Sequence, residues 1–406
     1  MKHPFNLKTA AACLLLTSIS GLSYASTPPS NAKMWEILKK QQKQIESLKK
    51  ENKLLSEKIN INADMSNQTV KKAADKPTHK IAKSVNSHTP SIGGYGELHY
   101  NNLDSGNEID FHRFVLFFSH DFTNRTRFFS ELELEHVISG NGKTGEIELE
   151  QAYIEHDLTN KLLARAGLFL IPVGILNETH EPNTFYGVER NPVEKNIIPT
   201  TWWEAGLALN GRINTGWSYD VALTSGLSTP TTGSKAYLIR SGRKQAAKAP
   251  ANDAAITARL SWTGIPGVKI SATVQRQQDI TQGTDSTAGA ATLFETNAVI
   301  QKGAFSLRAL YAQWKLDGSG PAALGRDKQK GWYIEPAYKL TPKLGLFARY
   351  NKWDNNAGNS AATEIKQTNY GINYWLHENV VFKADIQKQS GASSNDGFNL
   401  GMGYQF

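Results

Sequence analysis

Cysteine is almost absent from this sequence. The only one among the 406 residues is Cys13, which lies in an apolar run that we expect to be removed from the mature chain. Disulfides and thiolate metal sites are therefore excluded from the remainder. Long hydrophobic runs are absent too. After residue 25, no stretch approaches the roughly 18 consecutive apolar residues that a membrane-spanning helix requires.

Motifs typical of enzymes are also missing. The chain has no GxSxG elbow, phosphate-binding glycine loop, CxxC pair or HExxH helix. Its ten histidines form no recognisable ligand set. Glutamates two positions apart on a strand point to the same face. Such pairs, here Glu131/Glu133 and Glu148/Glu150, occur on any polar strand face, so they do not indicate acid–base catalysis. We expect no catalytic residue, no metal site and no cofactor.

The N-terminus has the pattern of a secretory signal peptide. Lys2 and Lys8 precede an apolar run at 10–22, and Ala25 ends a small-residue cleavage site. We therefore predict that residues 1–25 are removed on export. A membrane anchor is the alternative, but the run is shorter than the roughly 20 apolar residues that a spanning helix needs.

Positive charge is concentrated in the N-terminal arm. The formal net charge is +8, but residues 1–90 hold 15 Lys and Arg against 6 Asp and Glu, whereas residues 91–406 hold 30 against 31. An exported main domain of neutral charge argues against a nucleic-acid partner. The basic arm could instead contact the anionic cell wall, a hypothesis that depends on this charge alone.

The segment 26–60 is predicted to form a periplasmic coiled coil, and residues 61–90 a flexible polar linker. Leu38, Ile45, Asn52 and Ile59 recur every seven residues, and a second series begins at Met34. A solvated amphipathic helix is the alternative. The heptads do not decide between two and three strands.

From residue 91 to 406 the sequence alternates between apolar and polar residues in about sixteen segments of near-membrane-strand length. The expected strands are 92–103, 108–122, 126–140, 145–158, 162–174, 202–213, 216–227, 254–263, 268–280, 291–303, 304–316, 329–341, 344–356, 364–378, 380–390 and 396–406. Tight and long connections alternate, which favours an all-β transmembrane antiparallel barrel over a soluble β-sandwich. Tryptophan and tyrosine near many segment ends fit interfacial girdles.

Several stretches resemble the phosphate-selective porin O and P family of Gram-negative bacteria. They are SIGGYGELHY from residue 91, ELELEH from 131, EIELEQAYIEH from 146 and AGLFLIPVGILNETHEPNTFYGVERNPVEKNIIPTTWWEAG from 166. The resemblance covers roughly 91–406. It implies a 16-stranded outer-membrane barrel, a homotrimer surrounded by outer-membrane lipid, and diffusion of small solutes. Phe406 matches the C-terminal aromatic residue of outer-membrane proteins in general.

Successive side chains of a strand point to opposite faces, so the alternation along each expected strand, here called strand parity, predicts which charged residues line the pore. The predicted lining residues are Arg113, Arg127, Glu131, Glu133, Glu148, Glu150, Arg165, Glu204, Arg212, Arg259, Arg308, Arg349, Lys383 and Asp385. The resemblance implies a ladder of basic residues for phosphate. Residues 91–201, however, hold 8 basic against 17 acidic residues and residues 202–406 hold 22 against 14. Opposed acidic and basic walls are therefore at least as well supported.

The long connection at 175–201 is the main functional candidate, because loops of this length usually have a function. By resemblance it folds into the lumen and narrows it. Its predicted constriction residues are Glu178, His180, Glu181, Glu189, Arg190, Glu194 and Lys195. The alternative is an external cap or a latch on a neighbouring subunit. The second long connection, 228–253, with Arg240 and Lys244, is expected to face the outside.

The sequence thus predicts an outer-membrane porin with a water-filled channel for small hydrophilic solutes or ions, among them anions such as phosphate. Two other classes stay open. One is a plugged structural barrel, tethered to the cell wall. The other is an outer-membrane barrel enzyme, which would need a nucleophile and base at the rim that the sequence does not reveal.

Overall fold

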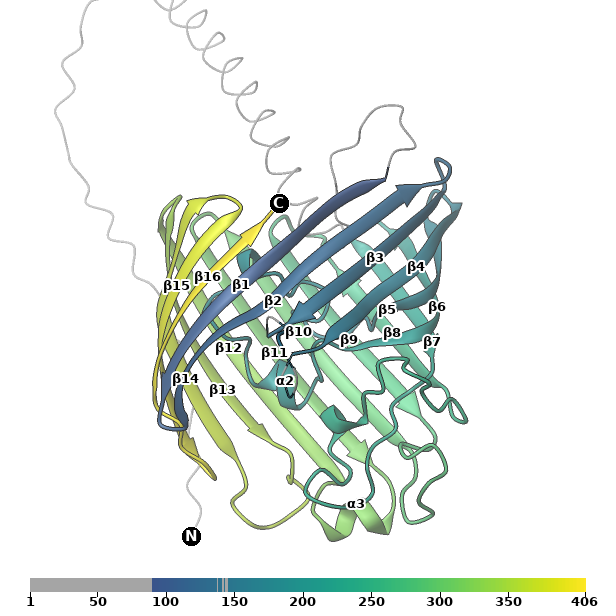
Figure 1. Ribbon diagram of the computed structural model, residues 1–406. Coiled ribbons are helices and arrows are strands. Elements are labelled where there is room, and N and C mark those ends of the chain that lie inside the picture. The colour runs from purple at the N-terminus through teal and green to yellow at the C-terminus, as the bar shows by residue number, and fades with distance from the viewer. Residues whose placement is uncertain (1–89, 137, 141, 143–144) are drawn as a thin grey trace, which may run out of the picture. The chain divides into compact units, whose positions relative to one another are not determined.

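Sixteen antiparallel strands form one closed barrel in the computed structural model, which describes residues 90–136, 138–140, 142 and 145–406 (Figure 1). The strands are β1 (Ser91–Leu103), β2 (Gly106–Asp121), β3 (Thr126–Glu135), β4 (Ile147–Thr159), β5 (Leu162–Leu170), β6 (Trp203–Asn214), β7 (Trp217–Thr224), β8 (Ala255–Trp262), β9 (Val268–Gln277), β10 (Ala291–Lys302), β11 (Phe305–Leu316), β12 (Lys328–Thr341), β13 (Leu344–Asp354), β14 (Ile365–His377), β15 (Val380–Gly391) and β16 (Gly397–Gln405). The predicted sixteen-stranded all-β barrel is confirmed. The expected signal peptide, coiled coil and most of the linker lie outside the described residues.

Short helical segments occur only in connections of the described part of the chain. They are η1 (Pro182–Thr184), α2 (Val193–Asn196), η2 (Ile239–Gly242) and α3 (Ser319–Ala323). Within the described ranges, no helix has the length and apolar character needed to cross a membrane.

The two ends of the barrel differ in their connections. At one end, here called the turn end, neighbouring strands are joined by tight turns, and the C-terminus lies there (Figure 1). At the opposite end, the loop end, the connections are mostly longer. The longest run from β5 to β6 and from β7 to β8. This is the alternation of tight and long connections that the sequence predicts.

The barrel closes where β1 meets β16, and small residues on β1 make that closure tight. Gly94 and Phe406 exchange two backbone hydrogen bonds, of 3.0 and 2.9 Å. A Cβ atom on Gly94 would lie 2.2 Å from the carbonyl oxygen of Val115, and one on Gly96 would lie 2.6 Å from the Tyr404 hydroxyl. The GGYG run therefore allows the C-terminal aromatic rings to cover the first strand.

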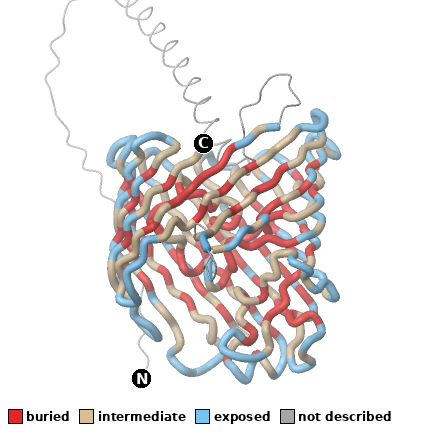
Figure 2. Tube along the Cα trace, viewed as in Figure 1, coloured by how far each residue is buried: buried red, intermediate tan, exposed pale blue. Residues whose placement is uncertain are grey.

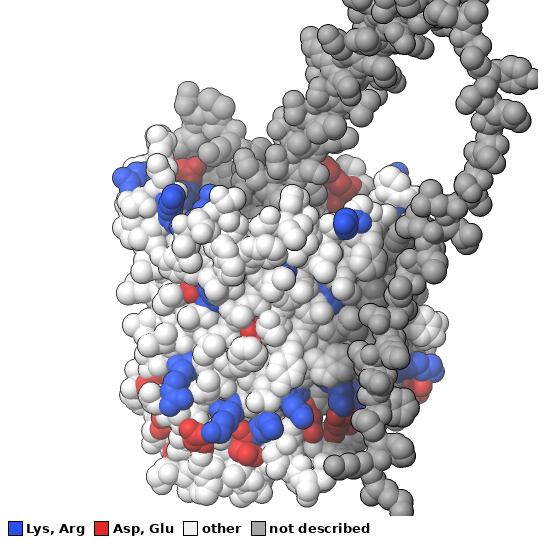
Figure 3. Space-filling model, turned by 180° about the vertical axis from the view of Figure 1, so that it is seen from behind, with Lys and Arg blue, Asp and Glu red and all other residues white. Residues whose placement is uncertain are grey.

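Side chains alternate between an apolar outer wall and a polar interior. On β8, Thr257 and Arg259 are buried, whereas Ile256 is 56% and Leu260 43% exposed. The same pattern of burial runs along most strands (Figure 2). On the face seen in Figure 3, charged side chains gather mainly towards the two ends, with few between them. Large exposed apolar side chains on a wall whose interior is polar fit a lipid environment.

Several strands end earlier than expected at the loop end, and the largest differences are in β3 and β5. β3 ends at Glu135 rather than residue 140, because His136 takes a φ of +48° and turns the chain away. β5 ends at Leu170 rather than residue 174, because Pro172 has no N–H to donate to a strand ladder. In both places the chain then leaves the wall.

Candidate functional site

The connection from β5 to β6 folds into the barrel; we call residues 171–202 the inner loop. Its two ends are held together by Asn177, which is fully buried. The Asn177 amide donates to the carbonyl oxygens of Ile171 and Trp202 at 2.8 and 2.9 Å, and its oxygen accepts from the Trp202 N–H at 2.7 Å. Because these bonds hold the two ends of the loop together, the residues between them extend into the lumen. Helix α2, within this loop, is visible inside the barrel in Figure 1.

Arginines on the opposite wall hold the inner loop by its backbone. Arg349 on β13 donates to the carbonyl oxygens of Tyr186 and Glu189, at 3.2 and 3.1 Å. Arg308 on β11 donates to the carbonyl oxygen of Thr184. Both side chains point inward, as strand parity predicts, and both are used as loop supports.

Further contacts extend to β15 and β8. Asp385 accepts from the Val188 N–H at 2.8 Å. The ammonium of Lys383 lies 3.6 Å from the centroid of the Phe185 ring. On the near side, Arg259 contacts Glu178 and pairs with Asp220 at 2.8 Å. The loop therefore crosses the lumen from the β5–β6 side to the β13–β15 wall.

Glycines on β16 allow the inner loop to approach the wall. A Cβ atom on Gly403 would lie 2.4 Å from Cβ of Pro182, and one on Gly401 would lie 3.0 Å from the Val188 side chain. The alternating glycines of the last strand, GMGYQ, thus face the lumen and receive the loop.

His180 anchors the inner loop to the acidic side of the barrel. Its Nε2 lies 3.3 Å from Glu131 on β3 and 3.4 Å from Glu150 on β4, and its Nδ1 lies 3.2 Å from the Asn177 carbonyl oxygen. Burial by itself would lower the pKa of His180, but the hydrogen bonds and charges of these glutamates raise it to about 10. The loop histidine is therefore a cation between two strand carboxylates.

Glu189 joins the loop to β1 through an ionic chain. Its carboxylate lies 3.0 Å from Nδ1 of His99, whose Nε2 lies 3.2 Å from Glu97. Arg113 contacts Glu97 at 2.7 Å and Glu133 at 3.4 Å. Burial alone would raise the pKa of Glu189, but His99 holds it well below its usual range.

Glu194 was expected to line the constriction, but its carboxylate is instead hydrogen-bonded inside the inner loop. Its carboxylate accepts from the N–H groups of Ile175 and Leu176, at 2.8 and 2.7 Å, and from the Tyr333 hydroxyl at 2.7 Å. It is fully buried, and burial raises its pKa. Glu204 has a similar bracing role, since it accepts from the Trp202 indole at 3.0 Å and the Gly226 N–H at 2.7 Å.

The second long connection, 228–253, was expected to face the outside, and for Arg240 that expectation is wrong, whereas residues 232–235 are exposed and Lys244 does not line the cavity. Arg240 donates to the carbonyl oxygens of Lys195 and Thr200, at 2.8 and 3.1 Å, and Arg243 donates to that of Thr201. This connection, which includes η2, therefore packs on the inner loop. Long loops have no alternation of apolar and polar residues, so sequence reasoning had no signal that could place it.

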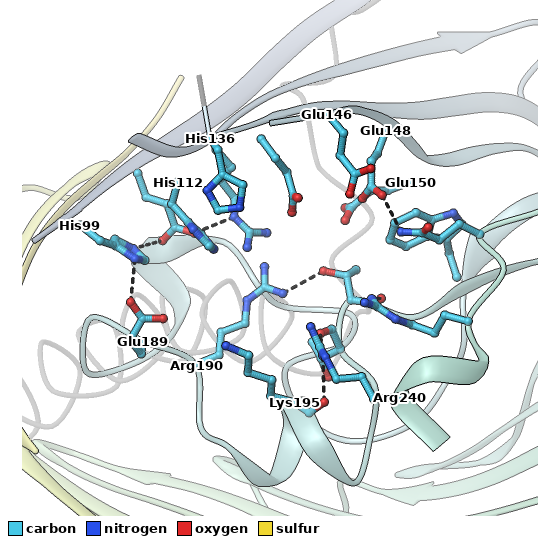
Figure 4. A pocket seen from close by; sticks show the side chains of 18 of the residues that line it. His99, His112, His136, Glu146, Glu148, Glu150, Glu189, Arg190, Lys195 and Arg240 are labelled. Carbon is cyan, nitrogen blue, oxygen red and sulfur yellow. Dashed lines mark hydrogen bonds and ion pairs between the residues drawn. The ribbon is translucent and has the colours of Figure 1, made fainter. Parts of the chain in front are cut away.

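Together the two loops and β1–β4 enclose a cavity of about 350 Å³ near the loop end (Figure 4). Glu146, Glu148 and Glu150 lie on one side, and Arg190, Lys195 and Arg240 lie on the other, together with Glu189. The lining also includes Arg113, Glu135 and Arg243. Burial together with Arg243 and Arg190 lowers the pKa of Arg240 to about 9, and burial lowers that of Lys195.

Four basic loop residues that line this cavity, Arg190, Lys195, Arg240 and Arg243, differ from the basic residues on the strands. In the part of the chain that the structure describes, Arg190, Arg240 and Arg243 bond only to Thr201 or to backbone oxygens, and none of the four forms an ion pair. Arg113, Arg165, Arg259 and Arg349, by contrast, each contact a carboxylate. These four side chains are therefore not neutralised by a direct ion pair within the described residues.

A second cavity of about 260 Å³ lies towards the turn end. Arg127, Arg212 and Arg259 line it together with Asp157 and other polar residues. Arg127 binds Asp157 through two hydrogen bonds of 2.8 and 3.0 Å. Arg165, between the two regions, contacts Glu155 at 3.0 Å and lies over the Tyr153 ring. Glu181 is buried just before η1 and lines neither cavity.

Three histidines that the sequence did not connect lie at the rim of the loop-end cavity. They are His99, His112 and His136, from β1, β2 and the end of β3. Their positions in the sequence show no ligand spacing, and only the pairing of neighbouring strands brings them together.

Comparison with known proteins agrees with this architecture. The family described as phosphate-selective porin O and P matches residues 93–400. A protein of Aquifex aeolicus (strain VF5), described as uncharacterized, is 30% identical over 351 residues, which span 75% of this chain and 77% of that protein.

Solved structures share the fold at low identity. The anion-selective porin from Comamonas acidovorans superposes with a TM-score of 0.56 at 12% identity, covering 78% of this chain and 99% of that one. The outer membrane channel DcaP of Acinetobacter baumannii gives 0.55 at 14% identity, over 78% and 97%. With the family matched over most of the barrel, the chain belongs to the phosphate-selective porin O and P family of outer-membrane channels.

Proposed function

We propose that this porin lets small hydrophilic ions and solutes diffuse past the inner loop, between an acidic and a basic wall. The observation that supports this most directly is the loop-end cavity, where Arg190, Lys195, Arg240 and Arg243 from the two loops line the same space as glutamates of β3 and β4. Charges on opposite sides of a narrow passage act strongly on an ion between them, because the effective dielectric there is below that of bulk water. The constriction is thus formed by both inward loops.

Anions are the species we propose to be held on the basic side. None of the four basic groups forms an ion pair of 4.0 Å or less with a described carboxylate, so a passing anion can bind to them directly. Phosphate and other small oxyanions fit this chemistry, because guanidinium groups bind them through paired hydrogen bonds. The anion-selective Comamonas porin, which shares the fold, is consistent with such a preference.

The experiment is to measure reversal potentials of the purified full-length protein in planar bilayers under a salt gradient. We expect discrete channel steps, a preference for anions, and reduced chloride current when phosphate is added. A barrel that inserts without channel steps would favour the plugged structural barrel instead. Hydrolysis of lipid or peptide substrates would favour the barrel enzyme.

Assembly is a separate part of the proposal. We propose a homotrimer in the outer membrane, with the turn end facing the periplasm so that the predicted coiled coil at 26–60 lies there. A trimer form of OmpT from Vibrio cholerae is among the proteins with this fold. Contact of the basic N-terminal arm with the cell wall stays a prediction from its charge.

A further inference from the structure

A carboxylate and two imidazoles converge at the rim of the loop-end cavity. The Oδ2 atom of Asp110 on β2 lies 2.9 Å from Nδ1 of His112 and 2.8 Å from Nδ1 of His136. All three potential ligand atoms lie within 4.8 Å of one another. Figure 4 shows the rings of His112 and His136 side by side above the cavity, with His99 next to them.

Local backbone features create this convergence. Asp110 and His112 are two residues apart, and the pairing of β1 with β2 shifts register between Glu97 and His99, at the same level. His136 follows the last residue of β3 with a φ of +48°, and its N–H donates to the His112 carbonyl oxygen at 3.0 Å. The kink after β3 thus directs the His136 ring towards the Asp110 carboxylate on β2.

These distances are close to those of a metal coordination shell. Zn–N and Zn–O bonds of about 2.0–2.2 Å place neighbouring ligand atoms about 3.3 Å apart in a tetrahedral site. The observed separations of 2.8 and 2.9 Å would open by a few tenths of an ångström, within the reach of small side-chain rotations. Two imidazoles with one carboxylate favour zinc, copper or nickel over magnesium or calcium.

The surroundings suit a bound cation that also keeps solvent ligands. The side chains of Asp110, His112 and His136 are 14%, 26% and 32% exposed, so an ion can enter from the cavity and retain water. His99 stacks on the His112 ring with centroids 4.8 Å apart, and is itself fixed by hydrogen bonds to Glu97 and Glu189. The fixed His99 ring limits how far the His112 ring can turn.

We propose that Asp110, His112 and His136 form a binding site for one divalent transition-metal ion, with Zn²⁺ as the probe. In this site Nδ1 of each histidine and Oδ2 of Asp110 bind the ion, and the remaining positions hold water or a solute. The alternative is a purely structural cluster, in which both rings donate hydrogen bonds to Asp110 and no metal binds.

The test uses the purified full-length protein in detergent after treatment with a chelator. Zn²⁺ is titrated by calorimetry, and Co²⁺ is added to record its visible d–d absorption. We expect one Zn²⁺ per chain and a Co²⁺ spectrum of four- or five-coordinate ligation. Asp110→Asn, His112→Gln and His136→Gln should each weaken Zn²⁺ binding by about tenfold or more.

His377→Gln is the matched control, because His377 is an exposed histidine at the turn end, outside the cluster. It should bind Zn²⁺ as the unchanged protein does. Histidines of the N-terminal arm are common to all variants, so they cannot produce a difference between them. The spectrum of the unchanged protein supplies an answer even if a variant fails to fold.

Three results would overturn the proposal: equal Zn²⁺ affinity in all variants, a Co²⁺ spectrum of the hexahydrated ion, or displacement of Zn²⁺ by equimolar Mg²⁺.

A further consequence for the channel current rests on the proposed function. Zn²⁺ added at the loop end should change the channel current, reversibly with chelator. If binding is seen without a change in current, the metal site stands and its link with permeation is lost.

Discussion

Charged side chains inside this barrel serve two purposes that strand parity cannot separate. Arg349 and Arg308 hold the inner loop by its backbone, and Glu194 braces it from within. Arg190, Lys195, Arg240 and Arg243 face the loop-end cavity without an ion-pair partner among the described residues. Changes in the first group should therefore affect assembly, and changes in the second should affect ion preference.

The first prediction concerns the basic side of the cavity. Arg240→Gln and Arg243→Gln should each move the channel towards cations, because a unit charge about 8 Å from a passing ion contributes about 0.5–1 kcal/mol at an effective dielectric of about 40–80, as in a water-filled passage. This corresponds to about a two- to fivefold change in the permeability ratio, measured from reversal potentials. Glu148→Gln, on the opposite wall, should shift it towards anions.

Lys244→Gln is the matched control for these substitutions. Lys244 lies in the same connection as Arg240 and Arg243 but does not line the cavity. Its neutralisation should leave the reversal potential within experimental error. An equal shift in all three variants would mean that the general charge of the loop end, rather than the cavity, determines selectivity.

At the scale of the element, the inner loop is fastened to the wall at separate places. His180 lies between Glu131 on β3 and Glu150 on β4, and the loop also packs against the glycines of β16, three strands from β3 in the closed barrel. Each fastening can be tested by itself, since one depends on charge and the other on space.

The second prediction is a pH dependence of the loop. The pKa of His180 is raised to about 10 from an ordinary value of 6.5, so protonated His180 stabilises the folded loop fully below 6.5. That stabilisation is lost as the pH rises through about 10. Single-channel current should be steady at neutral pH and fluctuate more as the pH approaches and passes about 10.

His180→Asn separates this effect from the titration of other groups. The variant lacks the titratable ring, so its current should already fluctuate at neutral pH and change little through the alkaline range. If the unchanged protein and the variant respond alike to alkaline pH, another group controls the loop.

The third prediction tests the close approach at β16. Gly403→Ala places a methyl group 2.4 Å from Cβ of Pro182, and proline cannot rotate away. The loop or strand must shift, at a cost of about 1–3 kcal/mol, which should lower the temperature at which the folded band disappears on gels. Gly289→Ala, with its nearest neighbour at 3.5 Å, should leave that temperature unchanged.

At the scale of the whole molecule, a closed barrel leaves no strand edge unpaired, and its outer wall is apolar. The fourth prediction is that the full-length protein forms heat-resistant trimers in detergent. Deleting residues 34–60 should leave barrels that still assemble but dissociate at lower temperature, as seen by native mass measurement and unheated gels. Only monomers of the intact protein would contradict it.

The sequence by itself determined the barrel wall. Sixteen strands, their alternation and the inward direction of residues such as Arg259 and Arg349 follow from a period of two, which is local and independent of distant contacts. The match at β12, predicted at 329–341 and observed at Lys328–Thr341, shows how little tertiary context that pattern needs.

Only the tertiary structure decided what happens inside the wall. Residues 90 and 163 positions apart meet in the contacts of His99 with Glu189 and of Arg349 with Tyr186. The inward course of the 228–253 connection likewise depends on backbone oxygens of the inner loop. Such contacts depend on shape and on the partner that each buried polar group finds, and no local period in the sequence encodes them.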